Sequence, residues 1–271
     1  MGISKRIEEA RKAYETGDEA LAAKIHEKAI IAAAATEEHG SASSKFIGSL
    51  VYGGLDGIIT TFAVVSGVAG AQLDPGIVII LGLANLFGDG FSMATGAYLS
   101  SKSEKEYYQR EREREAWEVD HFPEGEKAEL IEIYLSQGYP LEDAEKMVEI
   151  KSKDEERWVN AMMLEELGLM ENTSNPFTEA GYTMVAFIVA GAVPLLAYLA
   201  DFIFNLQIPA TQSFFISMAL SGLALFGLGA AKVKITERNP FRSGLEMLIV
   251  GGAAAGVAYL IGALLKGLGV G

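Results

Sequence analysis

Five long apolar stretches constrain the fold of this chain more than any other feature of its sequence. A bilayer core about 30 Å thick is crossed by roughly 20 helical residues, and the stretches have about that length. Five buried helices of a soluble core would carry polar faces, which these stretches lack. The sequence therefore predicts an all-α integral membrane protein with five transmembrane helices. The stretches lie at approximately 46–70, 76–100, 181–205, 213–231 and 244–265.

Most of the acidic side chains lie between the second and third stretches. Residues 101–179 hold 10 basic and 22 acidic side chains, whereas residues 46–100 hold no base and three Asp. This contrast predicts a cytoplasmic domain inserted into a membrane protein. The predicted parts are an N-terminal helical segment (1–45), transmembrane helices 1–2 (46–100), an acidic metal-binding domain (101–179) and transmembrane helices 3–5 (180–271).

Proline and glycine divide the inserted domain into three predicted helices. Pro123 stops the first helix, and Pro140 precedes the third. Gly138 and Gly168 are expected to end the second and third helices, as glycine commonly does. The predicted helices cover about 101–121, 124–137 and 141–168.

The overall composition excludes several classes of protein. The net charge of −14 disfavours nucleic acid, which binds clustered Lys and Arg. The absence of Cys excludes disulfides, thiolate metal sites and iron–sulfur clusters, and three His leave little room for a zinc centre. No catalytic residues are predicted, so the chain is not expected to be an enzyme.

The loop charges predict the orientation in the membrane. The loops after the first and third stretches contain no Lys or Arg. Cytoplasmic loops are enriched in these residues, so the N-terminus and the acidic domain should face the cytoplasm and the C-terminus the outside or a lumen. The lack of Cys is compatible with a prokaryotic plasma membrane, which is the expected location. The bases that carry the orientation argument are Lys102, Lys105, Arg110, Lys232, Lys234, Arg238 and Arg242.

Glycine pairs at short spacing recur in the apolar stretches. Small residues let membrane helices approach closely, so the pairs predict tight bundling or dimerisation. The pairs are Gly53 with Gly57, Gly222 with Gly227 and Gly252 with Gly256.

Two carboxylates lie inside the first two apolar stretches, where charge is costly. Asp56 and Asp89 have no Lys or Arg in either stretch to neutralise them. Asn85 and Met93 share a helical face with Asp89, and Thr60 lies one turn beyond Asp56. Oxygen ligands with one thioether suit Fe²⁺ better than Mg²⁺ or Ca²⁺. The alternatives are carboxyl groups held neutral between helices and a Met93 that only packs.

The acidic domain offers a second set of candidate ligands. Four glutamates separated by 7, 4 and 3 residues form a stripe on the first helix, namely Glu104, Glu111, Glu115 and Glu118. Met162, Met163 and Glu166 end the third predicted helix and place two thioethers beside a carboxylate. An exposed salt bridge with a neighbouring Arg is the alternative for Glu111. Glu118 and His121 also form a single E-x-x-H motif, which di-iron bundles use twice.

Four sequence motifs in order resemble the vacuolar iron transporter family, over about residues 40–265. The motifs are LDGIITTFAVVSGVAGA, GDGFSMATGAYLS, MMLEELGL and NPFTEAGYTMVAFIVAGAVPLLAYL. The resemblance implies five transmembrane helices, a homodimer with its path at the dimer interface, and a cytoplasmic three-helix metal-binding domain. It also implies export of Fe²⁺ from the cytosol in exchange for protons. The family's functional residues correspond to Asp56, Met93, Met162, Met163 and Glu166.

The chain departs from the family pattern at two positions. The E-x2-E-x7-E-x2-E pattern falls on Glu104, Tyr107, Glu115 and Glu118, so a phenol replaces one carboxylate. Ala97 stands where many members have an acidic residue. Fewer carboxylates imply fewer bound ions, weaker affinity or a different metal.

The leading hypothesis is a proton-coupled transporter of Fe²⁺, with Mn²⁺ and Zn²⁺ as alternative cargo and no other cofactor. Its expected partners are divalent ions, protons, membrane lipid and a second copy of the chain. Asp56 and Asp89 would alternate between proton and metal, and the acidic domain would collect the metal. The alternatives are a membrane-tethered di-iron oxidase or iron store, with Glu118 and His121 at its centre, and a metal sensor without flux.

Overall fold

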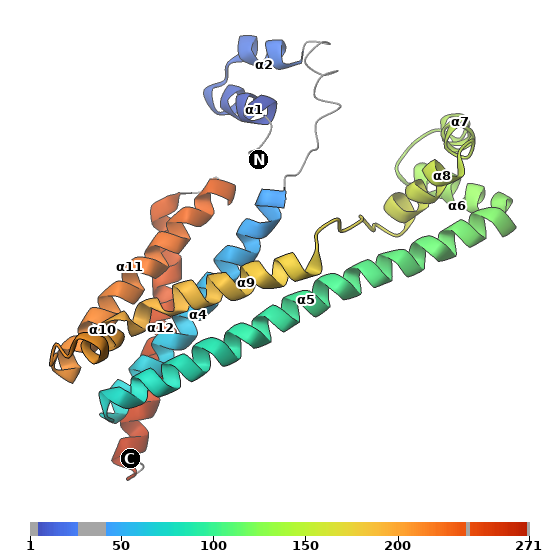
Figure 1. Ribbon diagram of the computed structural model, residues 1–271. Helices are drawn as coiled ribbons and strands as arrows, with labels where there is room; N and C mark the ends of the chain where they lie inside the picture. Colours follow the sequence, from blue (N-terminus) through green and yellow to red (C-terminus); the bar gives the residue numbers. More distant parts are fainter. Residues whose placement is uncertain (1–4, 27–41, 237–238, 270–271) are drawn as a thin grey trace. The chain divides into compact units, whose positions relative to one another are not determined.

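The computed structural model describes residues 5–26, 42–236 and 239–269, and every regular element in these residues is a helix (Figure 1). Part of the predicted N-terminal segment (27–41) and Arg238 of the orientation argument lie outside the described residues. The α-helices are α1 (Lys5–Thr16), α2 (Glu19–Ile25), α4 (Ala42–Ala71), α5 (Pro75–His121), α6 (Pro123–Ser136), α7 (Leu141–Lys151), α8 (Glu155–Ala161), α9 (Pro176–Gly191), α10 (Leu196–Phe204), α11 (Ala210–Thr236) and α12 (Pro240–Gly267). A π-helical turn, η1 (Met162–Glu166), and a 3₁₀ turn, η2 (Val193–Leu195), complete the list.

The chain forms two compact units. The membrane unit comprises Met1–Thr95 and Thr178–Gly271, and the acidic unit comprises Gly96–Phe177. The long helix α5 contributes residues to both units. The acidic unit covers most of the range 101–179 predicted for the inserted domain, with slightly earlier boundaries.

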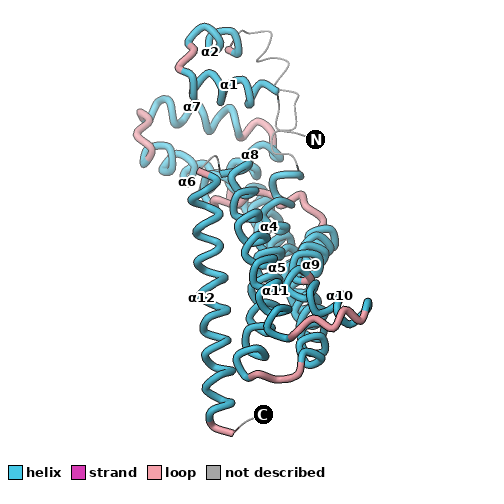
Figure 2. The backbone as a smooth tube through the Cα atoms, turned by 90° about the vertical axis from the view of Figure 1, so that its left-hand side faces the viewer, coloured by secondary structure: helices cyan, strands magenta, loops and turns pink. Residues whose placement is uncertain are grey.

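Among the described residues, five helical segments are long and apolar enough to cross a membrane, which confirms the predicted fold class. They are Gly48–Ala71, Pro75–His121, Pro176–Phe204, Ala210–Lys232 and Pro240–Gly267. Within the membrane unit, α4, α11 and α12 contact one another and run side by side in Figure 2. Side chains of α4, α5, η2, α10 and α12 form an apolar core that includes Phe62, Val65 and Leu195.

The third span is a broken helix. The sequence predicts one helix over 181–205, but α9 ends at Gly191, and η2 and α10 follow. The cause is Pro194, which lacks the N–H that a helix interior needs. The hydroxyl of Ser217 on α11 donates to the Pro194 carbonyl oxygen at 2.6 Å. This bond satisfies a buried acceptor at the break.

Glycines allow α4 to contact two other helices at the backbone. A Cβ atom on Gly57 would lie 2.4 Å from the carbonyl oxygen of Phe187 on α9. One on Gly70 would lie 2.1 Å from the Tyr259 carbonyl oxygen on α12. Gly53 and Gly57 thus make the predicted close approach. Gly252 and Gly256 do not, because no atom of the described residues comes within 4 Å of their added Cβ.

Replacing Gly57 with Ala is expected to destabilise the membrane unit by about 1–3 kcal/mol, because the new methyl overlaps a backbone atom and α4 must separate from α9. The thermal inactivation of purified protein in detergent measures the change. Gly252→Ala is the matched control, since its methyl enters open space on another membrane helix. Equal stability of the two variants would contradict the packing described.

The acidic unit folds around its own apolar core. Leu130 and Tyr134 of α6 and Val148 of α7 pack against Trp158 of α8. The prediction of one helix over 141–168 is wrong, because α7 ends at Lys151 and α8 starts at Glu155. The Asp154 carboxylate accepts a hydrogen bond from the Arg157 amide at 2.8 Å and caps the new helix.

Candidate metal centre and membrane carboxylates

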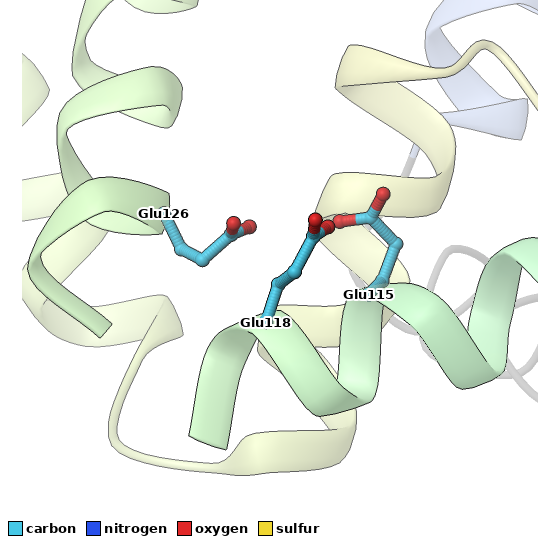
Figure 3. Close-up of side chains that lie close together, drawn as sticks. All are labelled: Glu115, Glu118 and Glu126. Carbon is cyan, nitrogen blue, oxygen red and sulfur yellow. The ribbon is translucent and has the colours of Figure 1, made fainter. Parts of the chain in front are cut away.

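Five glutamates of the acidic unit form two overlapping groups. Ligand oxygens of Glu115, Glu118 and Glu126 lie within 4.8 Å of one another, and so do those of Glu126, Glu129 and Glu166. Figure 3 shows the first group, in which Glu115 and Glu118 from one helix point toward Glu126 from another. Carboxylate oxygens that converge from separate helices suit a divalent cation.

Local structure explains why these glutamates converge. Glu115 and Glu118 lie three residues apart near the end of α5, and Glu126 and Glu129 lie three apart near the start of α6. Residues with this spacing share a helical face. Phe122 alone separates the two helices, because Pro123 begins α6 at once. The chain therefore turns directly between the two pairs.

Glu166 reaches the second group from the π-helical turn η1. The Leu167 amide donates to the Met162 carbonyl oxygen at 3.2 Å, five residues back. Such turns are rare and frequently occur at functional sites. A shallow pocket of about 410 Å³ lies beside this group, lined by Glu129, Glu132 and Glu166 among others.

Burial gives the site its electrostatic character. Glu115 is 0% exposed and Glu126 is 5% exposed. Burial first, and then the charge of Glu166, raises the pKa of Glu115 to about 7. Burial and then Glu129 raise the pKa of Glu126 to about 7. Burial and Glu129 also raise the pKa of Glu166.

Three buried oxygens in this site accept no hydrogen bond from the described residues, namely Oε1 and Oε2 of Glu115 and Oε2 of Glu126. Of these, Glu115 Oε1 lies 2.6 Å from Arg114 Nη2 as an ion pair. A buried carboxylate without a partner is costly, and either a proton or a cation removes that cost. The chemistry of these carboxylates therefore suits a proton or a cation near neutral pH.

Glu104 and Glu111 lie outside both carboxylate groups. Glu104 accepts a hydrogen bond from the Asn172 side chain at 3.0 Å. Glu111 accepts from Arg110 and Arg114, and these bonds lower the pKa of Glu111. Tyr107 lies under the Arg110 guanidinium, 5.2 Å from the centre of its ring. The structure thus unites Glu115, Glu118 and Glu166 of the predicted ligands and leaves these two glutamates apart.

Met162 and Met163 are buried in the core of the acidic unit, four and three residues before Glu166 in the chain. Sequence reasoning missed Glu126 and Glu129. The available signal was their E-x-x-E spacing just after Pro123, which repeats the spacing of Glu115 and Glu118.

The membrane carboxylates come from neighbouring helices. Asp56 on α4 and Asp89 on α5 are both half-buried and close enough for their charges to interact. Met93 is half-buried. The Asn85 amide nitrogen is buried without a hydrogen-bond partner among the described residues. The Thr60 hydroxyl donates to the Asp56 backbone carbonyl at 2.8 Å, so it supports the helix rather than the carboxylate.

Phe187 lies between the two helices that carry these carboxylates. Its side chain is fully buried, and a Cβ on Gly90 would lie 3.3 Å from its ring. Its backbone contacts Gly57 on the other helix. Sequence reasoning missed Phe187, although both aspartates are followed by glycine in the chain. These glycines let α4 and α5 approach the same aromatic residue.

An apolar cavity of the membrane unit is separate from these carboxylates. It holds about 990 Å³ and has a mainly apolar lining that includes Phe62, Phe214 and Tyr259. Neither aspartate lines it. Its chemistry does not suit a divalent ion.

Comparison with known proteins assigns the chain to a family. The sequence model of the VIT family matches residues 47–263, which include the acidic unit, the first four spans and most of the fifth. The chain belongs to the VIT family. This is a family of transporters rather than of enzymes, which confirms the expectation that the chain is not an enzyme.

Relatives of this VIT family member align over most of their length. A vacuolar iron transporter of Toxoplasma gondii is 40% identical over 85% of this chain and 78% of its own. One of Plasmodium falciparum is 36% identical over 97% of this chain and 98% of its own. Vacuolar iron transporter 1 of Arabidopsis thaliana is 32% identical over 83% of this chain and 88% of its own. These relatives are eukaryotic, so they support an integral membrane protein but not the predicted prokaryotic plasma membrane.

The acidic unit of this VIT family member should lose stability as pH rises. The pKa of Glu126 is 4.5 in an ordinary environment and about 7 in the folded protein, so the folded state holds the proton more tightly. The resulting stabilisation is present below pH 4.5 and lost as pH rises through about 7. Glu126→Gln, which cannot ionise, should match the wild type at pH 4 and melt roughly 3–6 °C higher at pH 8.

Tryptophan fluorescence in metal-free detergent solution measures this transition. Both tryptophans of the chain, Trp117 and Trp158, lie in the acidic unit, so their signal reports that unit alone. Glu124→Gln is the control, because Glu124 is an exposed residue of the same helix that pairs with Lys127. A difference between Glu126→Gln and the wild type that does not change with pH would contradict the assigned pKa.

Proposed function

We propose that this VIT family member exports Fe²⁺ from the cytosol in exchange for protons. The observation that carries the proposal is the pair Asp56 and Asp89, two interacting carboxylates on membrane helices with no Lys or Arg between residues 46 and 100. Intramembrane carboxylates without a basic partner are characteristic of ion and proton pathways. The relatives named as vacuolar iron transporters support iron as the cargo.

The exchange follows from the charge of the two carboxylates. One divalent cation neutralises both, and so do two protons, whereas two bare negative charges in a membrane are strongly disfavoured. The pair therefore holds either metal or protons. Asn85 and Met93 lie one turn to each side of Asp89 on α5 and supply an amide and a thioether to the same path. Mn²⁺ and Zn²⁺ are further cargo that such a ligand set accepts.

The acidic unit collects the metal on the cytoplasmic side in this proposal. Glu115 and Glu126, with pKa values of about 7, release protons as the metal binds. The N-terminus then faces the cytoplasm, and the C-terminus faces the outside or a lumen. Two copies of the chain form the transporter, with the path at the interface between them.

The di-iron oxidase alternative is not favoured. Its candidate His121 stacks on Trp117 with ring centres 4.4 Å apart, and its Nδ1 lies 2.8 Å from the Trp117 carbonyl oxygen. Among the described residues, His121 belongs to neither carboxylate group. The carboxylates alone are a poor match to the paired E-x-x-H motifs of di-iron bundles.

Metal flux tests the proposal against a sensor without transport. Proteoliposomes that contain a metal-quenched dye are exposed to anaerobic Fe²⁺. Quenching well above that of protein-free liposomes is expected. Metal binding by the purified protein without quenching in proteoliposomes would instead support the sensor.

A further inference from the structure

One cation already lies at the first carboxylate group. Arg114 Nη2 is 2.6 Å from Glu115 Oε1, and Arg114 Nη1 is 2.5 Å from Glu118 Oε2. Its Nε donates to Glu111 Oε2 at 3.0 Å. Two of these three carboxylates belong to the group of Glu115, Glu118 and Glu126. The guanidinium thus occupies ligand oxygens that a metal would need.

The charge of Arg114 acts beyond its direct contacts. It opposes the rise in the pKa of both Glu115 and Glu166, so it partly neutralises both carboxylate groups. Charge-assisted hydrogen bonds to carboxylates are among the stronger ones in proteins. A metal that binds through Glu115 and Glu118 must therefore replace these bonds.

A second partner, Glu111, is within reach of the Arg114 guanidinium. Its side chain is 42% exposed, so it has room to move, and Glu111 remains as a partner. The Glu111 side chain is only 12% exposed and is held by Arg110 as well, which fixes it in place. Glu111, which lies outside both carboxylate groups, therefore stays available to the Arg114 guanidinium.

We infer that Arg114 is a built-in competitor of the metal, which holds Glu115 and Glu118 in the metal-free protein and swings to Glu111 when metal binds. The inference rests on the proposed function, in which the acidic unit collects metal. Arg114 is a positioning residue that weakens metal binding and speeds release. A collecting site must release its metal to the transport path, so an internal competitor suits that task.

The test compares Arg114→Gln with Arg110→Gln in the full-length protein. Arg110 contacts Glu111 but neither carboxylate group, so it is a matched control for loss of one guanidinium on the same helix. Anaerobic Fe²⁺ is titrated while tryptophan fluorescence reports the acidic unit. Arg114→Gln should bind about threefold to tenfold more tightly than the wild type and release metal to a chelator correspondingly more slowly. Arg110→Gln should stay close to the wild type.

Two further variants separate the possible failures. Glu115→Gln/Glu118→Gln should lose the fluorescence response, and adding Arg114→Gln should then change nothing. If the double variant binds as the wild type does, metal is not held by Glu115 and Glu118, and the inference is overturned. The collecting role itself is tested by Glu126→Gln, which removes a ligand from both carboxylate groups, and unaltered binding by that variant would refute the role. If the double variant loses binding but Arg114→Gln binds equally or more weakly, Arg114 organises the ligands and the inference alone is overturned.

Arg114→Lys keeps the positive charge, so it tests the inference even if Arg114→Gln fails to fold. An ammonium group cannot bridge three carboxylates as the planar guanidinium does. The metal affinity of Arg114→Lys should therefore lie between those of the wild type and Arg114→Gln. An Arg114→Lys affinity below that of the wild type would also overturn the inference.

Discussion

Asp56→Asn is expected to reduce Fe²⁺ transport to the level of protein-free liposomes while leaving the protein folded. Asn has the shape of Asp but carries no charge and releases no proton, so the pair with Asp89 loses half of its exchange capacity. Fe²⁺ then meets one carboxylate instead of two in a membrane environment, where an unneutralised charge is costly. The measurement is initial dye quenching in proteoliposomes at matched protein content.

Asp74→Asn is the matched control for this substitution. Asp74 precedes α5, and its carboxylate accepts a hydrogen bond from the Gly76 amide at 2.7 Å. Asn caps helices about as well as Asp, so both fold and transport should survive. Transport by Asp56→Asn at the rate of the Asp74→Asn control would remove Asp56 from the proposed path.

Glu126→Gln is expected to abolish metal binding by the acidic unit at concentrations that saturate the wild type. Glu126 belongs to both carboxylate groups, so one substitution removes a ligand from each. We expect the affinity for Fe²⁺ to fall by about 100-fold or more. Loss of a residue that only supports a metal ligand already lowers affinity by about 10-fold to 100-fold, and Glu126 is itself a proposed ligand. Equilibrium dialysis of the purified protein against anaerobic Fe²⁺ measures the loss.

Transport by the same variant separates collection from translocation. If the acidic unit only supplies metal, Glu126→Gln should raise the Fe²⁺ concentration needed for half-maximal flux and leave the maximal flux nearly unchanged. Glu124→Gln, on the same helix but paired with Lys127, should change neither value. Unaltered metal binding by Glu126→Gln would show that the two carboxylate groups do not hold the metal.

The membrane spans were predictable from the sequence because their signal is local. Length and apolar composition alone decide whether a helix crosses a bilayer, and all five predicted spans are present. The break at Pro194 required the partner that satisfies its carbonyl, Ser217 on another helix. Proline in a membrane helix is tolerated when a neighbour makes such a bond, so its sequence position did not predict the geometry.

The acidic unit shows what sequence alone could not supply. The stripe on the first helix pointed to Glu115 and Glu118, but their partner Glu126 depends on the turn at Phe122. The break before α8 depends on the Asp154 side chain, which caps that helix. An Asp in a charged sequence can equally lie on an exposed helix face, so its position alone did not predict the cap. The ion pairs that Glu111 makes with Arg110 and Arg114 likewise depend on side-chain positions rather than on spacing.

Metal flux under a controlled pH gradient tests the central claim most directly. Proteoliposomes with the metal-quenched dye inside receive anaerobic Fe²⁺ outside, first with an acidic lumen and then with the gradient collapsed by a protonophore. Exchange predicts fast quenching with the acidic lumen, slow quenching after collapse, and alkalinisation of the lumen as Fe²⁺ enters. Equal quenching with and without the gradient would contradict proton exchange, even if Fe²⁺ crosses the membrane.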